Sequence, residues 1–392
     1  MGARNPFDHR LSTTLLISIV YPLGPAAIIL MPMIVGGLID GFGFSEQQAA
    51  NLASLEGLGL VIASVIASLW IRKVSWVGAL ALALLAYAVL NALSANLDQY
   101  MPLLVLRFLT GLAGGSLFSV AIAALGDNRE PDRAFGLAQA VQGAMMLAGF
   151  AAAPWLLQAW NVRALYYMLA AAAVLMLPVL YRFPSQGAVT SGSAGGAAKF
   201  GRNDLLIWLG LAASVIFFIN VFGFWAFAER IGQAAQLPAG TIGLALGISQ
   251  IMAIAGALGA ALASDRYGRA WPLLIVCIGQ SLAVFVLIGT FGPAVYFVST
   301  GLFQALFVVG VSYQMGAVAK LDVKGRYLVM MTAAQGLGAA FGPALAASLI
   351  RTEGDYGGIL VMAAACCLVS TLMFLFIVYR SRRRGGFNPG AA

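Results

Sequence analysis

Charged side chains are scarce in this chain. Only 9% of its 392 residues are Asp, Glu, Lys or Arg, whereas 61% are hydrophobic and the mean hydropathy is +0.92. A soluble domain carries roughly 25% charged residues, so this chain has too few polar side chains to cover a surface in water. The net charge of +8 does not indicate a nucleic-acid partner, because the basic residues lie between apolar runs instead of clustering.

Residue types that bind metals or form disulfides are also rare. The only histidine is His9, and the three cysteines, Cys277, Cys366 and Cys367, all lie inside apolar runs. Neither a metal site nor a disulfide framework is therefore expected. The sequence has no G-x-x-x-x-G-K-S/T phosphate loop and no H-E-x-x-H motif. We expect no cofactor, no catalytic residues and no enzymatic activity, and the lack of a filter segment disfavours a channel.

Long apolar runs account for most of the chain. A helix that crosses a bilayer needs about 20 apolar residues, and twelve such helices with short connections fit the length. The sequence therefore predicts an all-α membrane protein with twelve transmembrane helices. The first run is too long for a cleavable signal peptide. Ser45 with Gln48 three residues later is typical of a capping box at the start of the second run. The predicted spans are residues 13–39, 47–71, 76–95, 101–125, 134–158, 163–181, 204–228, 238–263, 271–291, 294–319, 327–350 and 357–380.

The polar segments divide the chain into two halves. Residues 182–203 are rich in Gly, Ser and Ala, a composition typical of a flexible linker. They separate a six-helix half at 13–181 from a second at 204–380, between a polar tail at 1–12 and a basic tail at 381–392. A shift of 193 residues places Arg326 on Arg133 and Gln335 on Gln142. Two pseudo-symmetric halves with a binding site near the bilayer midplane are expected from such a repeat.

The basic residues predict the orientation. If both tails, the linker and alternate connections share one side, that side holds eighteen of the 22 basic residues. The other side holds Arg163, Arg230 and Arg351, and Arg107 lies within a span. The positive-inside rule then places both termini and the linker in the cytoplasm. We expect a bacterial inner-membrane protein, monomeric in the lipid bilayer.

The connection between the eighth and ninth spans carries a motif. Residues 261–270 read ALASDRYGRA and resemble the G-x-x-x-D-R-x-G-R-R loop of the major facilitator superfamily, with Ala261 and Ala270 replacing its first Gly and last Arg. Gly268 can adopt the positive φ that so short a turn needs. The resemblance implies a secondary transporter over residues 13–380. It also implies a cytoplasmic latch, whose candidate residues are Asp265, Arg266, Gly268, Arg269, Arg72 and Arg133.

The first half departs from the loop pattern. Arg72 occupies the position matched to Asp265, and it would meet the positive start of the eleventh span near Arg326. We hypothesise one effective latch, between Asp265 and the start of the fifth span near Arg133.

Two further segments resemble patterns of the superfamily. Arg107, Gly111 and Gly115 match the fourth-helix pattern R-x-x-x-G-x-x-x-G, in which the arginine is associated with proton handling and the small residues allow close helix approach. Gly143, Gly149 and Pro154 are similar, with different spacing, to the glycine–proline pattern of drug–proton antiporters. The first span contains Pro22, Gly24, Pro25 and Pro32, which is typical of a bending element beside a cavity and also of ordinary membrane helices.

Glu56 and Arg107 are the ionisable residues deepest in the predicted spans. Charged groups there are costly and usually face a partner or the bundle interior. Our hypothesis pairs them as a proton-coupling device, since burial favours a neutral carboxyl group and a neighbouring guanidinium favours the ionised form. The alternatives are a permanently closed structural pair, or a glutamate in a wet cavity without coupling.

The remaining site candidates are neutral. Spans 1, 4, 7 and 10 line the cavity in this family, which implies Tyr21, Arg107, Asn220, Phe224, Gln304 and Phe307 as wall residues, with Gln142, Gln250 and Gln335 as further substrate-binding candidates. A large apolar cavity with few polar anchors suits a hydrophobic or amphipathic solute, and one arginine suits a carboxylate.

We expect proton-coupled export of a small molecule by alternating access. Uptake of an organic acid or other metabolite by symport is one alternative. A membrane receptor or assembly protein that transports nothing is another, and the short loops argue against it.

Overall fold

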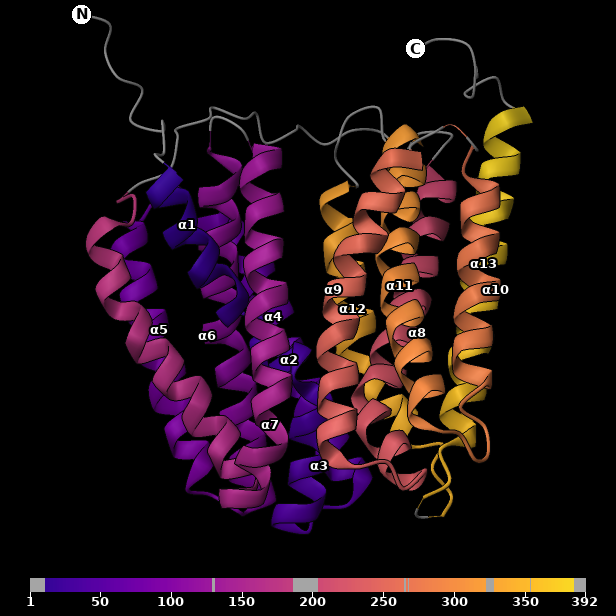
Figure 1. Cartoon of the computed structure of the whole chain (residues 1–392). Coiled ribbons are helices and arrows are strands. Elements are labelled where there is room, and N and C mark those ends of the chain that lie inside the picture. The colour runs from indigo at the N-terminus through magenta and orange to yellow at the C-terminus, as the bar shows by residue number, and fades with distance from the viewer. Residues whose placement is uncertain are drawn as a thin grey trace, which may run out of the picture. The chain divides into compact units, whose positions relative to one another are not determined.

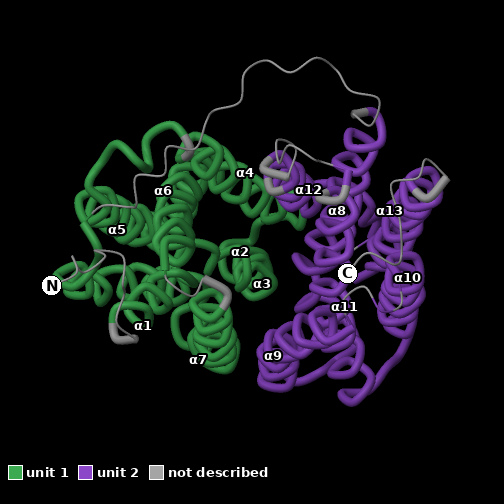
Figure 2. The backbone as a smooth tube through the Cα atoms, turned by 90° about the horizontal axis from the view of Figure 1, so that it is seen from above, with its two compact units in different colours: residues 1–192 green, residues 193–392 purple. Residues whose placement is uncertain are grey.

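The computed structural model of this chain describes residues 11–128, 131–185, 204–263, 266, 268–321, 328–352 and 354–383. These residues are helices and short connections, with no strand among them. The chain divides into two compact units, Met1–Gly192 and Ser193–Ala392 (Figure 2). The division lies within the segment 182–203.

The first crossing of unit 1 is interrupted. It consists of α1 (Leu11–Val20), the 3-10 helix η1 (Tyr21–Leu23), α2 (Ala26–Ile29) and α3 (Met31–Phe42) (Figure 1). A proline lies at or beside the start of η1, α2 and α3, because proline lacks the N–H group that a continuous helix needs and fits the first turn of a new one. The first crossing is therefore a broken helix at the positions of its three prolines.

Four longer helices complete unit 1. They are α4 (Glu46–Trp70), α5 (Trp76–Ala95), α6 (Tyr100–Gly126) and α7 (Pro131–Met176), followed by the 3-10 helix η2 (Leu177–Arg182). At about 1.5 Å per residue, α7 is about twice as long as a bilayer core is thick. Its backbone leaves the helical region at Trp160 (φ −143°, ψ 26°) and Asn161 (φ 50°, ψ −154°). α7 is therefore two crossings joined at a corner, as the spans 134–158 and 163–181 predicted.

The described residues of unit 2 form six helices, one for each remaining crossing. They are α8 (Asp204–Ala234), α9 (Ala239–Ala263), α10 (Ala270–Phe285), α11 (Pro293–Leu321), α12 (Leu328–Ala347) and α13 (Gly357–Arg383). α9 packs on α11 as α4 packs on α6, and α10 packs on α11 as α5 packs on α6. The two units therefore repeat the same helix pairings, which agrees with the 193-residue repeat in the sequence.

The described helices have the surface of a membrane protein. Eight of them, with α7 taken as one helix, are long and apolar enough to cross a bilayer. Large aliphatic side chains such as Leu82 (73% exposed) and Leu262 (75% exposed) point outward, where lipid replaces water. The chain is an all-α integral membrane protein of twelve crossings.

Two local predictions are confirmed. Ser45 begins α4 with a reciprocal capping box: the Gln48 N–H donates to Ser45 Oγ at 3.2 Å, and the Ser45 N–H donates to Gln48 Oε1 at 3.0 Å. Gly268 has φ +64° in the turn between α9 and α10.

Candidate functional site

A close backbone approach positions the ionisable residues of unit 1. A Cβ atom added to Gly111 would lie 2.0 Å from the carbonyl oxygen of Glu56, so only glycine lets α6 contact the α4 backbone here. Arg107 lies one turn before Gly111 on the same face of α6. The close approach predicted from the Gly111–Gly115 spacing is confirmed, and it brings Arg107 beside Glu56.

The guanidinium of Arg107 is held mainly by neutral groups. Its Nη1 donates to Asn91 Oδ1 at 3.2 Å, and its Nη2 donates to Thr110 Oγ1 at 3.1 Å and to Ser94 Oγ. Glu56 Oε1 lies farther away, 3.5 Å from Nη1. Arg107 is 1% exposed. α5 and α6 therefore fix the cation, and Glu56 is an additional and looser partner.

An aromatic ring and a small cavity complete the site. The Tyr166 ring of α7 lies 4.4 Å from Arg107 Cζ, a cation–π contact. Glu56, which is 6% exposed, lines a cavity of about 10 Å³ together with residues of α2, α3, α6 and α7. That is about the space that one water molecule needs. The carboxyl group thus faces both a fixed cation and a water-sized space.

The interrupted first crossing forms a wall of this cavity. Ala27 and Ile28 of α2, with Met31 of α3, line it together with Glu56. The break itself is pressed against α6, because Cβ atoms added to Gly24 and Gly114 would lie 2.6 and 2.7 Å from each other's carbonyl oxygens. The proline-broken segment therefore lies directly beside the charged pair.

The sequence reasoning missed most partners of Arg107. Asn91, Ser94, Thr110 and Tyr166 were not among the expected site residues. Asn91 and Ser94 are three apart in an otherwise apolar span, so they share one helix face. That spacing was the available signal for a polar face on α5.

The predicted residues Asn220 and Phe224 lie in the interior of unit 2. Asn220 is 1% exposed, and its Nδ2 donates to Gln280 Oε1 at 3.1 Å. Gln280 in turn donates to the Phe303 carbonyl at 3.3 Å. Phe224 is 0% exposed and packs on the Phe303 ring at 4.4 Å. The Asn220 side chain therefore holds α8 to α10.

An aromatic cluster lies between α8 and α11. The half-buried Phe307 ring has centroid distances of 6.4 Å to Phe217, 5.5 Å to Phe218 and 6.4 Å to Phe222. Phe222 is also half-buried. Unit 2 thus presents an apolar aromatic surface at α8 and α11.

The other predicted substrate-binding residues are distributed over both units. Tyr21 is buried in η1 against Phe118, with ring centroids 5.1 Å apart. Gln250 Nε2 lies 3.5 Å from Ser249 Oγ. The remaining three are amides with one buried atom that has no hydrogen-bond partner among the described residues, namely Gln142 Oε1, Gln304 Oε1 and Gln335 Nε2.

The predicted latch residues are only partly described. Asp265 and Arg326 lie outside the described residues, so the proposed contacts of both are outside them too. Arg266 and Arg133 are exposed, whereas Arg269 begins α10 and is 7% exposed.

Arg72 has a partner within its own unit. Its guanidinium forms a two-point ion pair with the Asp127 carboxylate, with N–O distances of 2.5 and 3.0 Å, and lies 5.7 Å above the Trp76 ring. The Arg72 charge is thus compensated inside unit 1.

Comparison with known proteins identifies the family. Residues 15–300 and 210–392 match the sequence profile of the Major Facilitator Superfamily. The chain belongs to this superfamily. No curated protein sequence matches it. Superfamily membership, the two six-helix units and the apolar helices together make it a membrane transporter by fold.

Solved structures of the superfamily share the fold at low sequence identity. The nucleoside transporter NupG is 13% identical with a TM-score of 0.74, covering 94% of this chain and 99% of that one. A D-xylose–proton symporter is 15% identical with a TM-score of 0.74, covering 93% and 96%. A bacterial homologue of the human lysosomal transporter Spinster is 12% identical with a TM-score of 0.70, covering 99% and 100%.

Proposed function

We propose that this superfamily member is a proton-coupled secondary transporter that exports a small hydrophobic or amphipathic solute. Glu56 is the proton site and Arg107 its fixed counter-charge. The observation that carries the proposal is the buried Glu56–Arg107 contact of 3.5 Å beside a water-sized cavity. Alternating access in a bacterial inner membrane, with both termini cytoplasmic, completes the proposal.

The looseness of the contact supports coupling over a permanently closed pair. Three neutral side chains hold Arg107, so protonation of Glu56 removes only one of its contacts. Arg107 therefore stays in place while the Glu56 carboxyl group gains or loses a proton. The cavity at Glu56 is walled by the broken first crossing, and movement of that segment would open or close the path of the proton.

The proposed class of solute depends on which side chains can still contact a solute. The Nη atoms of Arg107 donate to protein groups, which argues against Arg107 as the anchor of a carboxylate solute. The cluster of Phe218, Phe222 and Phe307 offers apolar surface that suits a hydrophobic or amphipathic molecule. A D-xylose–proton symporter has the same fold, so the fold accommodates proton coupling.

The test uses everted membrane vesicles and proteoliposomes with ethidium as the probe. Wild-type protein should accumulate ethidium in everted vesicles when a proton gradient is applied. Glu56→Gln should abolish this driven accumulation but preserve ethidium exchange across proteoliposomes without a gradient. Ser249→Ala is the matched control, since it alters the position related to Glu56 by the 193-residue repeat, and it should preserve both activities.

Other outcomes would overturn parts of the proposal. Gradient-driven transport that survives Glu56→Gln would remove Glu56 as the proton site. Proton-driven uptake of salicylate into right-side-out vesicles, without ethidium export, would indicate symport of an organic acid. Movement of neither probe, nor of any solute in a wider panel, would favour a receptor that transports nothing.

A further inference from the structure

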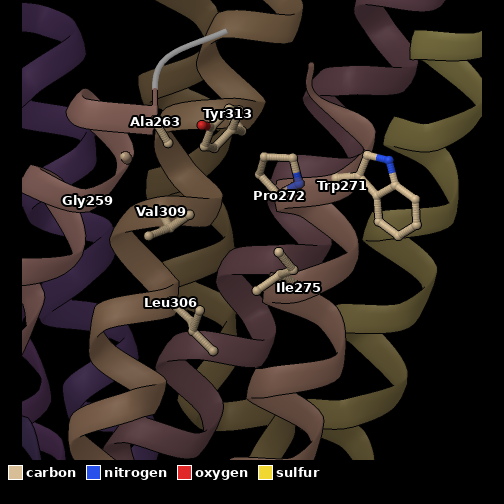
Figure 3. A pocket seen from close by; sticks show the side chains of 9 residues that line it. Gly259, Ala263, Trp271, Pro272, Ile275, Leu306, Val309 and Tyr313 are labelled. Carbon is tan, nitrogen blue, oxygen red and sulfur yellow. The ribbon is translucent and has the colours of Figure 1, made fainter. Parts of the chain in front are cut away.

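A deep apolar groove lies on unit 2 between α9, α10 and α11. Its volume is about 530 Å³, within the range of sites that hold a drug-sized molecule. Figure 3 shows Gly259 and Ala263 of α9 on one side, Pro272 and Ile275 of α10 on the other, and residues of α11 between them. α9 and α10 both pack on α11, so α11 forms the floor of the groove.

The groove exists because α9 carries small residues at this end. A Cβ atom added to Gly259 would meet nothing within 4 Å, so the space beside it is empty. In unit 1 the positions related by the 193-residue repeat are Ile66 and Trp70, in place of Gly259 and Ala263. The related positions of unit 1 thus carry large side chains where unit 2 has small ones.

The groove faces the surroundings of the helix bundle. Trp271 (67% exposed) and Ile275 (59% exposed) lie on its rim, whereas Leu306 (9%) and Tyr313 (6%) lie in its floor. In a membrane these outward side chains contact lipid, and a tryptophan at a helix end marks the level of the headgroups. The groove therefore opens toward acyl chains near one membrane interface.

Basic residues gather at that end of the unit. The exposed Arg266 follows α9, and Arg269 begins α10 and approaches the end of α11, where a Cβ atom on Gly316 would lie 3.2 Å from its Cζ. These two arginines place positive charge at this end of the groove, where it attracts anions.

We infer that the groove between α9, α10 and α11 is a binding site for an anionic phospholipid, with one acyl chain in the groove and the phosphate near Arg266. Basic pockets between transmembrane helices on the cytoplasmic side bind such headgroups. The groove supplies the apolar half of the site and the α9–α10 turn supplies the charged half. This inference is independent of the proton-coupling proposal, because it uses none of the same residues.

The experiment measures quenching of Trp271 fluorescence by brominated lipids. Wild-type protein and Trp271→Phe are reconstituted into phosphatidylcholine nanodiscs with a small fraction of brominated phosphatidylglycerol or brominated phosphatidylcholine. The difference between the two proteins isolates the Trp271 signal. Phosphatidylglycerol should quench this signal at several-fold lower lipid fraction than phosphatidylcholine, and Arg266→Gln should reduce that preference by about fivefold, the contribution typical of one basic residue.

Groove-filling variants separate a specific site from ordinary contact with the bilayer. Gly259→Leu should abolish the preference for phosphatidylglycerol. Gly240→Leu is the matched control on the opposite end of α9, where an added Cβ also meets nothing within 4 Å, and it should preserve the preference. Melting curves of both variants in detergent establish that they remain folded.

Several results would overturn the inference. If the two brominated lipids quench Trp271 of the wild-type protein equally, the inference is overturned. Displacement of both lipids by ethidium, with no preference between them, would make the groove a solute path. Gly259 and Ala263 are four apart, a spacing that also suits helix association, so a dimer that Gly259→Leu disrupts would assign the groove to a second copy.

Discussion

The two units share helix pairings but differ in what those pairings hold. The 193-residue repeat places Ser249 at the position of Glu56 and Thr300 at that of Arg107. Both replacements are fully buried. Ser249 Oγ donates to the Leu246 carbonyl at 2.7 Å, and Thr300 Oγ1 donates to the Tyr296 carbonyl at 2.8 Å. Each hydroxyl is thus satisfied by its own helix, whereas the unit 1 pair depends on other helices.

This difference indicates that the packing of the helices does not determine which polar residues they bury. Gly256 of α9 packs on the α11 backbone much as Gly111 of α6 packs on the α4 backbone. An added Cβ atom would lie 2.2 Å from a backbone carbonyl oxygen of α11 at Gly256, and 2.0 Å from one of α4 at Gly111. Similar close packing supports a charged site in one unit and self-satisfied hydroxyls in the other. This difference agrees with our proposal of a proton site in unit 1 and an apolar contact surface for the solute in unit 2.

The largest expected effect comes from Arg107→Met. Removal of the cation leaves Glu56 buried without its counter-charge, and Asn91 and Ser94 lose a donor. Breaking a buried ion pair in this way costs about 3–5 kcal/mol of folding free energy. Denaturation of the purified protein in detergent micelles measures it.

The matched change in unit 2 is Thr300→Ala. It removes a hydroxyl bonded within its own helix, and we expect a loss of about 1 kcal/mol or less. Equal losses for the two variants would contradict the asymmetry. Adding Glu56→Gln to Arg107→Met should restore part of the lost stability, because the uncompensated carboxylate is then neutral.

Gly111→Ala should have the next largest effect. The added methyl group meets the Glu56 carbonyl, so α4 and α6 must separate, at about 1–3 kcal/mol. Thermal unfolding measures the loss, and Gly126→Ala on the same helix, where an added Cβ meets nothing within 4 Å, should change little.

The corresponding change in unit 2 sharpens the comparison. Gly256→Ala should lower stability by a similar amount, because its clash is also with backbone. In ethidium transport, however, only Gly111→Ala should alter the dependence on the proton gradient. If Gly256→Ala showed the same coupling defect, proton coupling would not be confined to unit 1 as proposed.

The sequence predicted the features that depend on local chemistry. Prolines at 22, 25 and 32 predicted the broken first crossing, and Ser45 with Gln48 predicted a helix start. The glycine spacing at 111 and 115 predicted a contact face, and scarcity of charge singled out Glu56 and Arg107. Each of these signals works within one helix or follows from the high cost of a buried charge.

The sequence did not predict how the helices are rotated about their axes. Spans that are apolar on all sides show no preferred face, so nothing indicated that Asn91 and Ser94 turn toward Arg107. For the same reason nothing in the sequence indicated that Phe224 packs fully buried against Phe303. The partner of Arg72 also depends on tertiary packing, because Asp127 lies 55 residues away in the chain.

A moderate effect is expected from Asn220→Leu. The change removes one of the two donors to Gln280 Oε1, since the Cys367 thiol also donates to it at 3.3 Å, and we expect a loss of about 1 kcal/mol. The melting temperature should fall, while the pH profile of ethidium transport should keep its shape, since no ionisable group is altered. A shifted pH profile would bring unit 2 into the proton pathway.

The smallest effect is expected from Arg72→Gln. The Arg72–Asp127 pair is partly exposed to solvent, with 39% of the Arg72 side chain accessible, and such pairs contribute about 0–1 kcal/mol. The difference from wild type should shrink further in high salt. Lys73→Gln is the control for loss of an exposed basic residue. A loss above about 2 kcal/mol of folding free energy for Arg72→Gln would show that the Arg72–Asp127 pair is a major stabilising contact of unit 1.

The corner in α7 has a practical consequence for epitope insertion. Asn161 adopts a positive φ, its Oδ1 accepts the Arg163 N–H at 3.0 Å, and α3 packs against it, since a Cβ on Gly41 would lie 2.8 Å from Asn161 Cβ. Two crossings are thus joined without any spare connecting chain. A reporter tag placed there would damage the bundle instead of revealing its sidedness, whereas the longer α12–α13 connection offers room for one.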